Sequence, residues 1–240
     1  VINNYSTLYM ANNDQKPIVS LKSPIHEMGH IFGLLDLYNS SGQTPVYFMS
    51  AMANAISPVP QGLSIKEKEA LGWTDHSTLK TITEPGEYKV KLSGTATDPD
   101  DCIGYKAGIP ELNRTLYLEY RNFSADGSKY DKSEKQLTNS ETSNIKSGLV
   151  CYLAKSDIRF PSNLNGKPGN WALEVMGGTQ STKSDAALGV SDSLQVTDKL
   201  KVTVTAIEGD VLTFQIEGEM EQHVHSGGQA TCTKKAVCEE

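Results

Sequence analysis

Two histidines four residues apart constrain this chain more than any other feature of its 240 residues. His26 and His30 belong to the run His-Glu-Met-Gly-His, and this spacing places both imidazoles on one face of an α-helix. Each ring can then offer one nitrogen to the same metal ion. Glu27, between them, can act as general base toward a metal-bound water. Asp36 follows at a set spacing after Gly33 and makes a third ligand available. Three protein ligands and one open position are the requirements of a catalytic zinc site.

The surrounding residues predict a helix that packs into a core. Ser23 and Pro24 form a helix start, with Ser as N-cap and Pro at the first helical position. Apolar residues recur at steps of three and four: Ile25, Met28, Ile31, Phe32 and Leu35. Gly33 can end the helix with a positive φ, after which Asp36 can point back toward the metal. An ordinary core helix explains the apolar residues equally well. It does not explain the inner histidines, because buried titratable groups are costly unless paired or metal-bound.

These residues and several later segments resemble the immune inhibitor A family of secreted bacterial zinc metallopeptidases, which are metzincin-like zincins. In related zincins the extended motif ends in His, and Asp36 stands in that place here. The run Phe48-Met49-Ser50 resembles the segment that carries the methionine turn, an apolar floor under the metal. Three further segments resemble the family's next helix and two later strands: Gly62–Trp73, Arg114–Asn122 and Ser147–Tyr152. The resemblance extends from about Ser23 to about Gly218.

The resemblance implies a zinc-dependent endopeptidase that hydrolyses peptide bonds of proteins. His26, His30 and Asp36 would bind one zinc ion, and Glu27 would activate the zinc-bound water. The substrate would be a protein or peptide, and the location would be secreted or at the bacterial cell surface, with attachment through missing C-terminal modules as a further option. The alternative is a non-catalytic cell-surface binding or adhesion module that retains a zincin-like scaffold.

Two features depart from the family pattern. The family has a long region before the zinc helix, whereas 25 residues precede His26 here and the chain begins with Val1. We therefore interpret the chain as a fragment that lacks the N-terminal part. Some metzincins also place a tyrosine soon after the methionine turn to stabilise the transition state. None follows Met49 closely, and for the nearby Tyr38 and Tyr47 aromatic packing at the cleft edge is the simpler interpretation.

The sequence periodicity changes from helical to alternating after Trp73. Ser64 and Glu67 form a capping box, which predicts a short helix to about Leu71. Alternating segments with turns between them then predict an antiparallel β-sandwich: Glu87–Leu92, Leu116–Tyr120, Lys199–Ile207 and Val211–Ile216. The last two segments flank a short turn around Gly209, which predicts a hairpin.

The expected fold class is therefore α+β, in three parts. Residues 1–78 form the C-terminal part of a zincin catalytic domain, with the zinc helix, an irregular Met-turn segment and a short helix. Residues 79–218 form the antiparallel β-sandwich. Residues 219–240 form a polar linker and the start of a Cys-containing repeat.

Two further groups of residues could bind metal ions. The polar tail carries four candidate ligands of a structural zinc, for which a flexible linker is the default interpretation: His223, His225, Cys232 and Cys238. An acidic run could bind calcium or form a solvated turn: Asp98, Asp100 and Asp101. For Cys102 and Cys151, a disulfide and two separate thiols are both open.

The charge, the lengths of the apolar runs and the missing motifs argue against several other functions. The formal charge of −7, without a sizeable basic cluster, argues against binding to nucleic acid phosphates. No apolar run is long enough for a transmembrane segment. The sequence has neither a G-x-S-x-G nucleophile motif nor a glycine-rich phosphate loop.

Overall fold

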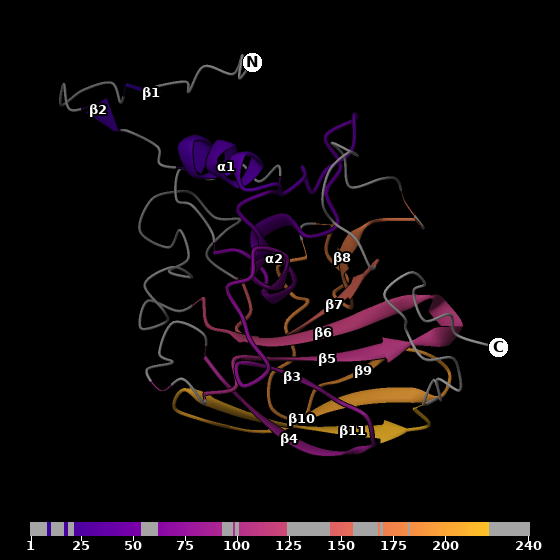
Figure 1. Ribbon diagram of the computed structural model, residues 1–240. Coiled ribbons are helices and arrows are strands. Elements are labelled where there is room, and N and C mark those ends of the chain that lie inside the picture. Colours follow the sequence, from indigo (N-terminus) through magenta and orange to yellow (C-terminus); the bar gives the residue numbers. More distant parts are fainter. Residues whose placement is uncertain are drawn as a thin grey trace, which may run out of the picture.

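The computed structural model describes residues 9–10, 17–18, 22–53, 62–92, 98, 101–123, 145–155, 168, 170–181 and 183–220. In this part of the chain two β-sheets lie face to face, and helices lie on the outer side of one of them (Figure 1). The described fold is mixed but strand-rich, and its sheets are antiparallel apart from one parallel strand pair. This agrees with the β-sandwich predicted for the second half of the sequence.

The four-stranded sheet forms the layer farthest from the helices (Figure 1). Its strands are antiparallel neighbours in the order β4 (Gly86–Lys91), β11 (Val211–Gly218), β10 (Leu200–Glu208) and β9 (Ser193–Gln195). β10 and β11 are the predicted hairpin. Gly209 at its tip has a φ of +62°, a left-handed conformation that glycine adopts without strain.

The five-stranded sheet is the middle layer. Its order is β3 (Leu79–Thr81), β5 (Gly104–Ile109), β6 (Arg114–Arg121), β7 (Gly148–Ala154) and β8 (Leu173–Val175). The remaining elements are short: β1 (Tyr9–Met10), β2 (Pro17–Ile18), α1 (Lys22–Ile31), α2 (Ile65–Ala70), and 3₁₀ turns at Tyr47–Met49 and Pro110–Leu112.

Strand β6 divides its side chains between two cores, because successive residues of a strand point to opposite faces. Leu116 and Leu118 pack between the two sheets. Tyr117 belongs to the core on the helix side. That second core also contains residues from the segment after α1 and from α2: Leu34, Leu35, Leu37, Val46, Met49, Met52 and Ile65. The helical segments and the sandwich are therefore joined through the middle sheet.

Helix α2 forms where the sequence predicted it. Ser64 is the N-cap and accepts a hydrogen bond from the Glu67 amide, while the Glu67 carboxylate accepts one from the Ser64 amide. This reciprocal pair satisfies two amides that a helix start otherwise leaves without partners. Gly72, with a φ of +72°, follows the last turn, as expected for the end of the helix.

Helix α1 differs from the prediction in two respects. It begins at Lys22, so Ser23 and Pro24 lie within its first turn rather than at its cap and first position. More importantly, the prediction that its apolar residues pack into a core is wrong for four of the five. These four are exposed: Ile25 at 37%, Met28 at 50%, Ile31 at 65% and Phe32 at 55%. Leu35, in the loop after the helix, is buried. The periodicity identified the helix but not what covers its apolar face.

The other candidate sites are resolved in part. Cys102 and Cys151 are free thiols, and burial raises the pKa of Cys151 to about 12. Asp101 accepts a hydrogen bond from Lys91 and another from the backbone amide of Asp98, which favours the solvated turn over a calcium site. Asp100 and the four tail residues, His223, His225, Cys232 and Cys238, lie outside the described residues. Among the residues described, no helix is long and apolar enough to cross a membrane.

Candidate metal centre

Helix α1 and the loop after it bring together the three predicted metal ligands. Oδ1 of Asp36 lies 2.9 Å from Nε2 of His26 and 3.2 Å from Nε2 of His30. The candidate ligand atoms of the three residues all lie within 4.8 Å of one another. Gly33, at the end of α1, adopts a φ of +91°, which turns the chain so that Asp36 faces the histidines. The sequence motif thus places these residues in one cluster.

The Nδ1 atoms of both histidines are fixed by backbone carbonyls, which orients each ring with Nε2 toward Asp36. Nδ1 of His26 donates to the carbonyl oxygen of Ala51 at 3.0 Å, and Nδ1 of His30 donates to that of Leu34 at 2.9 Å. A carbonyl oxygen can only accept, so each Nδ1 carries a hydrogen. Each Nε2 faces Asp36 and would bind a metal ion that takes the place of the proton between the ring and the carboxylate.

The electrostatics of this cluster favour a positive charge between the three side chains. Partial burial acts to raise the pKa of Asp36, but hydrogen bonds from His26 and His30 outweigh it and hold this pKa well below its usual range. The hydrogen bond to Asp36 raises the pKa of His30, although burial opposes the change. The arrangement that favours a proton on His30 also favours a cation in the same place. Two imidazole nitrogens and a carboxylate oxygen are a ligand set that zinc takes in catalytic sites.

Glu27 lies beside these ligands on α1 and is half-buried. Among the described residues, no hydrogen bond or ion pair occupies its carboxylate. Its negative charge is the smallest of the causes that raise the pKa of His30, after the hydrogen bond to Asp36. A carboxylate that no described residue binds, next to three candidate ligands, is available for proton transfer.

Tyr38 packs against the cluster. Its ring stacks on that of His26, with the centroids 6.1 Å apart and the planes 18° from parallel. Burial, followed by a hydrogen bond to Asp36, raises the pKa of Tyr38 well above its ordinary value. The aromatic packing expected for Tyr38 is therefore present, together with a polar contact to the third candidate ligand.

The methionine that lies against the helix is Met52. A Cβ on Gly29 would lie 2.3 Å from the Met52 sulfur, so only glycine permits this close approach. Met49, the residue that the resemblance indicated, is also fully buried, but its carbonyl oxygen accepts a hydrogen bond from Arg121 of β6. The resemblance indicates residues 48–50 as the apolar floor, whereas the methionine that contacts α1 is Met52, two residues beyond that run.

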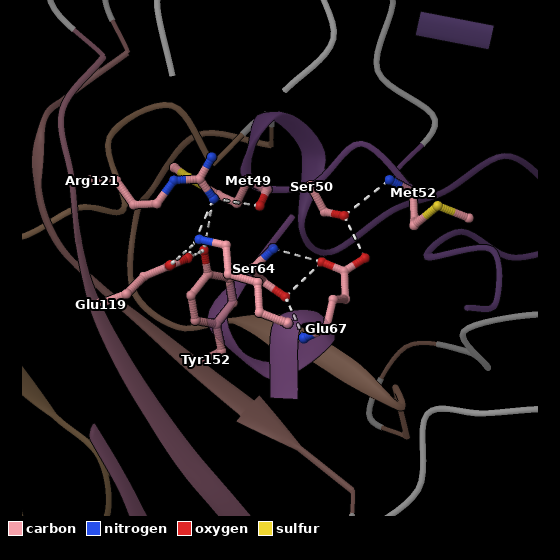
Figure 2. Close-up of polar contacts among 9 residues, drawn as sticks. Met49, Ser50, Met52, Ser64, Glu67, Glu119, Arg121 and Tyr152 are labelled. Carbon is pink, nitrogen blue, oxygen red and sulfur yellow. Dashed lines mark hydrogen bonds and ion pairs between the residues drawn. The ribbon is translucent and has the colours of Figure 1, made fainter. Parts of the chain in front are cut away.

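A buried polar network lies under this segment (Figure 2). Nη1 of Arg121 donates to the carbonyl of Met49 at 2.7 Å and lies 3.3 Å from Oε1 of Glu119. The hydroxyl of Tyr152 donates to the same carboxylate at 2.6 Å. Arg121 and Glu119 are 1% and 0% exposed, so the strand β6 holds the Met49 carbonyl from inside the core.

A second part of the network starts from α2. The Glu67 carboxylate accepts a hydrogen bond from the Ser50 hydroxyl at 2.7 Å, and the Ser50 oxygen accepts one from the Met52 amide at 2.9 Å (Figure 2). Burial raises the pKa of Glu67, and the hydrogen bonds from Ser64 and Ser50 oppose that rise. The sequence revealed Glu67 only as half of a capping box. Its contact with Ser50 spans 17 residues and left no local signal.

No protein-family model, curated protein or solved structure matches this chain.

Proposed function

We propose that this protein is a zinc-dependent endopeptidase that hydrolyses peptide bonds of proteins. The observation that carries the proposal is the convergence of His26, His30 and Asp36, with both histidines donating through Nδ1 to backbone carbonyls. A purely structural cluster would not need Glu27 beside it with its carboxylate left without a hydrogen-bond partner among the described residues.

The residues of the chain have distinct roles in this mechanism. His26 and His30 each present Nε2, and Asp36 presents a carboxylate oxygen, so that together they would hold zinc. A bound zinc ion would lower the pKa of a water molecule toward neutrality and polarise the scissile carbonyl. Glu27 takes the proton of the attacking water and delivers it to the leaving amine.

The proposal extends to the protein's class and location. The order of segments resembles that of immune inhibitor A-type metallopeptidases, so we assign residues 1–78 to a zincin-type catalytic domain and residues 79–218 to a β-sandwich domain. The same resemblance supports a secreted or cell-surface protein that acts on protein or peptide substrates.

The test is zinc content by elemental analysis together with casein hydrolysis, for the protein and its Glu27→Gln variant. One zinc per chain in both, with hydrolysis only by the unmodified protein, is the expected result. Glu87→Gln, an exposed carboxylate on β4, is the matched control and should retain full activity.

Three outcomes would contradict parts of the proposal. A protein without zinc would remove the metal centre. Hydrolysis by Glu27→Gln would remove the assignment of the base. Zinc without hydrolysis by either protein would favour the alternative, a non-catalytic binding module that retains a zincin-like scaffold.

A further inference from the structure

We propose that Ser50 and Glu67 are positioning residues of the metal centre, which they organise through the turn at residues 50–52. The inference rests on the proposed function, because it concerns how the zinc ligands are oriented. No hydrogen bond or ion pair among the described residues joins either residue to the side chains of the candidate ligands. Both residues instead fix the backbone of residues 50–52, whose carbonyl groups make those contacts.

The turn contacts the metal centre at two places. The carbonyl of Ala51 accepts the hydrogen bond from Nδ1 of His26, which orients that ring and sets its tautomer. The carbonyl of Met52 accepts a hydrogen bond from the amide of Leu37 at 2.9 Å. Leu37 directly follows Asp36, so the same turn also restrains the third candidate ligand.

Ser50 sets the shape of this turn. Its hydroxyl oxygen accepts from the Met52 amide at 2.9 Å, a bond that spans Ala51. Its hydroxyl hydrogen is donated to Oε1 of Glu67 at 2.7 Å. Ser50 is completely buried, so no water can replace these partners without rearrangement. The direction of the Ala51 carbonyl therefore depends on where Glu67 holds Ser50.

The two carboxylate oxygens of Glu67 have separate tasks. Oε2 accepts from the amide and the hydroxyl of Ser64, at 2.8 and 2.6 Å, and closes the cap of α2. Oε1 accepts from Ser50 and has no part in the cap. Helix capping therefore does not require Ser50, and the two tasks can be separated by substitution.

The experiment measures zinc affinity by competition with a chelator, and thermal stability in the metal-free protein, for three single variants. Ser50→Ala should weaken zinc binding about tenfold, the lower end of the range for residues behind a metal ligand. Glu67→Gln should weaken it similarly while keeping a capping box, which accepts Gln as well as Glu. Ser64→Ala is the control: it should lower the melting temperature without changing zinc affinity.

A double variant tests whether the two residues act as one chain of contacts. Ser50→Ala combined with Glu67→Gln should weaken zinc binding no more than either change alone, because both interrupt the same path. Zinc affinity that is unchanged in Ser50→Ala and Glu67→Gln, or that weakens equally in Ser64→Ala, would overturn the positioning role while leaving the zinc site intact. An unmodified protein that binds no zinc would overturn the proposed function and this inference with it. If Ser50→Ala does not fold, the comparison of Glu67→Gln with Ser64→Ala decides the question.

Discussion

On the face of the middle sheet that meets the four-stranded sheet, strand β6 buries the apolar side chains of Leu116 and Leu118. On the opposite face, on the side of the candidate metal centre, the same strand buries the charged side chains of Glu119 and Arg121. The apolar contacts are non-directional and contribute in proportion to the area removed from water. The charged contacts are directional and hold one chosen atom, the Met49 carbonyl, despite the unfavourable desolvation of both charges. The first face stabilises the fold and the second determines where a backbone segment lies.

The largest expected effect comes from breaking the charged face. Arg121→Met removes the guanidinium from the buried Glu119 carboxylate and leaves it the Tyr152 hydroxyl at 2.6 Å and the Lys68 ammonium at 3.7 Å. This change should lower the free energy of unfolding by about 4 kcal/mol. Urea denaturation of the metal-free protein measures the loss. Arg114→Met, at the other end of β6, is the control and should lose less, because its partner Glu174 is 29% exposed. A loss below about 1 kcal/mol for Arg121→Met would show that the pair is not effectively desolvated.

The apolar face should respond in stability alone. Leu118→Ala removes a fully buried side chain and should lower the free energy of unfolding by about 3 kcal/mol. Its zinc affinity in the folded protein should equal that of the unmodified protein, as measured by chelator competition below the unfolding temperature. A weakened affinity would mean that the two faces of the sheet are not independent.

A third comparison uses pH. Partial burial acts to raise the pKa of Glu69, but hydrogen bonds from Lys106, Lys66 and Tyr117 outweigh it and lower this pKa from 4.5 to about 2. Because the folded value lies below the ordinary one, the resulting stability is present above pH 4.5 and is lost as the pH falls through about 2. The contribution is on the order of 2 kcal/mol once partial exposure is allowed for. Glu69→Gln should lack this part of the acid dependence in urea titrations between pH 5 and pH 2, and an unchanged profile would contradict the assignment.

The smallest effect is expected on the exposed side of α1. Phe32 is 55% exposed and its ring lies 6.3 Å from that of Trp73, which is 60% exposed. Phe32→Ser should change the free energy of unfolding by less than about 0.5 kcal/mol, as for other surface substitutions. Thermal denaturation checks this, with the buried Leu34→Ala as the destabilised reference. A loss as large as that of Leu34→Ala would show that Phe32 is packed in solution.

What the sequence predicted correctly depends on short-range geometry. The histidine pair follows from the helical repeat, the cap of α2 from Ser64 and Glu67 three residues apart, and the β10–β11 hairpin from alternation on both sides of Gly209. Each of these needs at most a few neighbouring residues. The clustering of Asp36 with the histidines also follows from one turn after Gly33.

What the sequence did not predict depends on contacts between distant residues. The bond from Arg121 to Met49 spans 72 residues, and a single charged residue in a strand does not reveal whether it faces water or a core. Met49 and Met52 lie three residues apart, and the sequence does not show which of them contacts α1. That depends on the direction in which the chain turns between them. Periodicity likewise cannot distinguish an apolar helix face that is covered from one that is exposed, as α1 shows.

The contact between Gly29 and Met52 makes the residue that position 29 accepts depend on the residue at position 52. Any side chain at position 29 needs the space that the Met52 sulfur fills, so Gly29→Ala alone should be rejected in a library selected for activity. Paired with a smaller residue at position 52 the same change becomes tolerable, since the void left by the methionine accepts the new methyl group. A library that varies this motif should therefore vary positions 29 and 52 in combination.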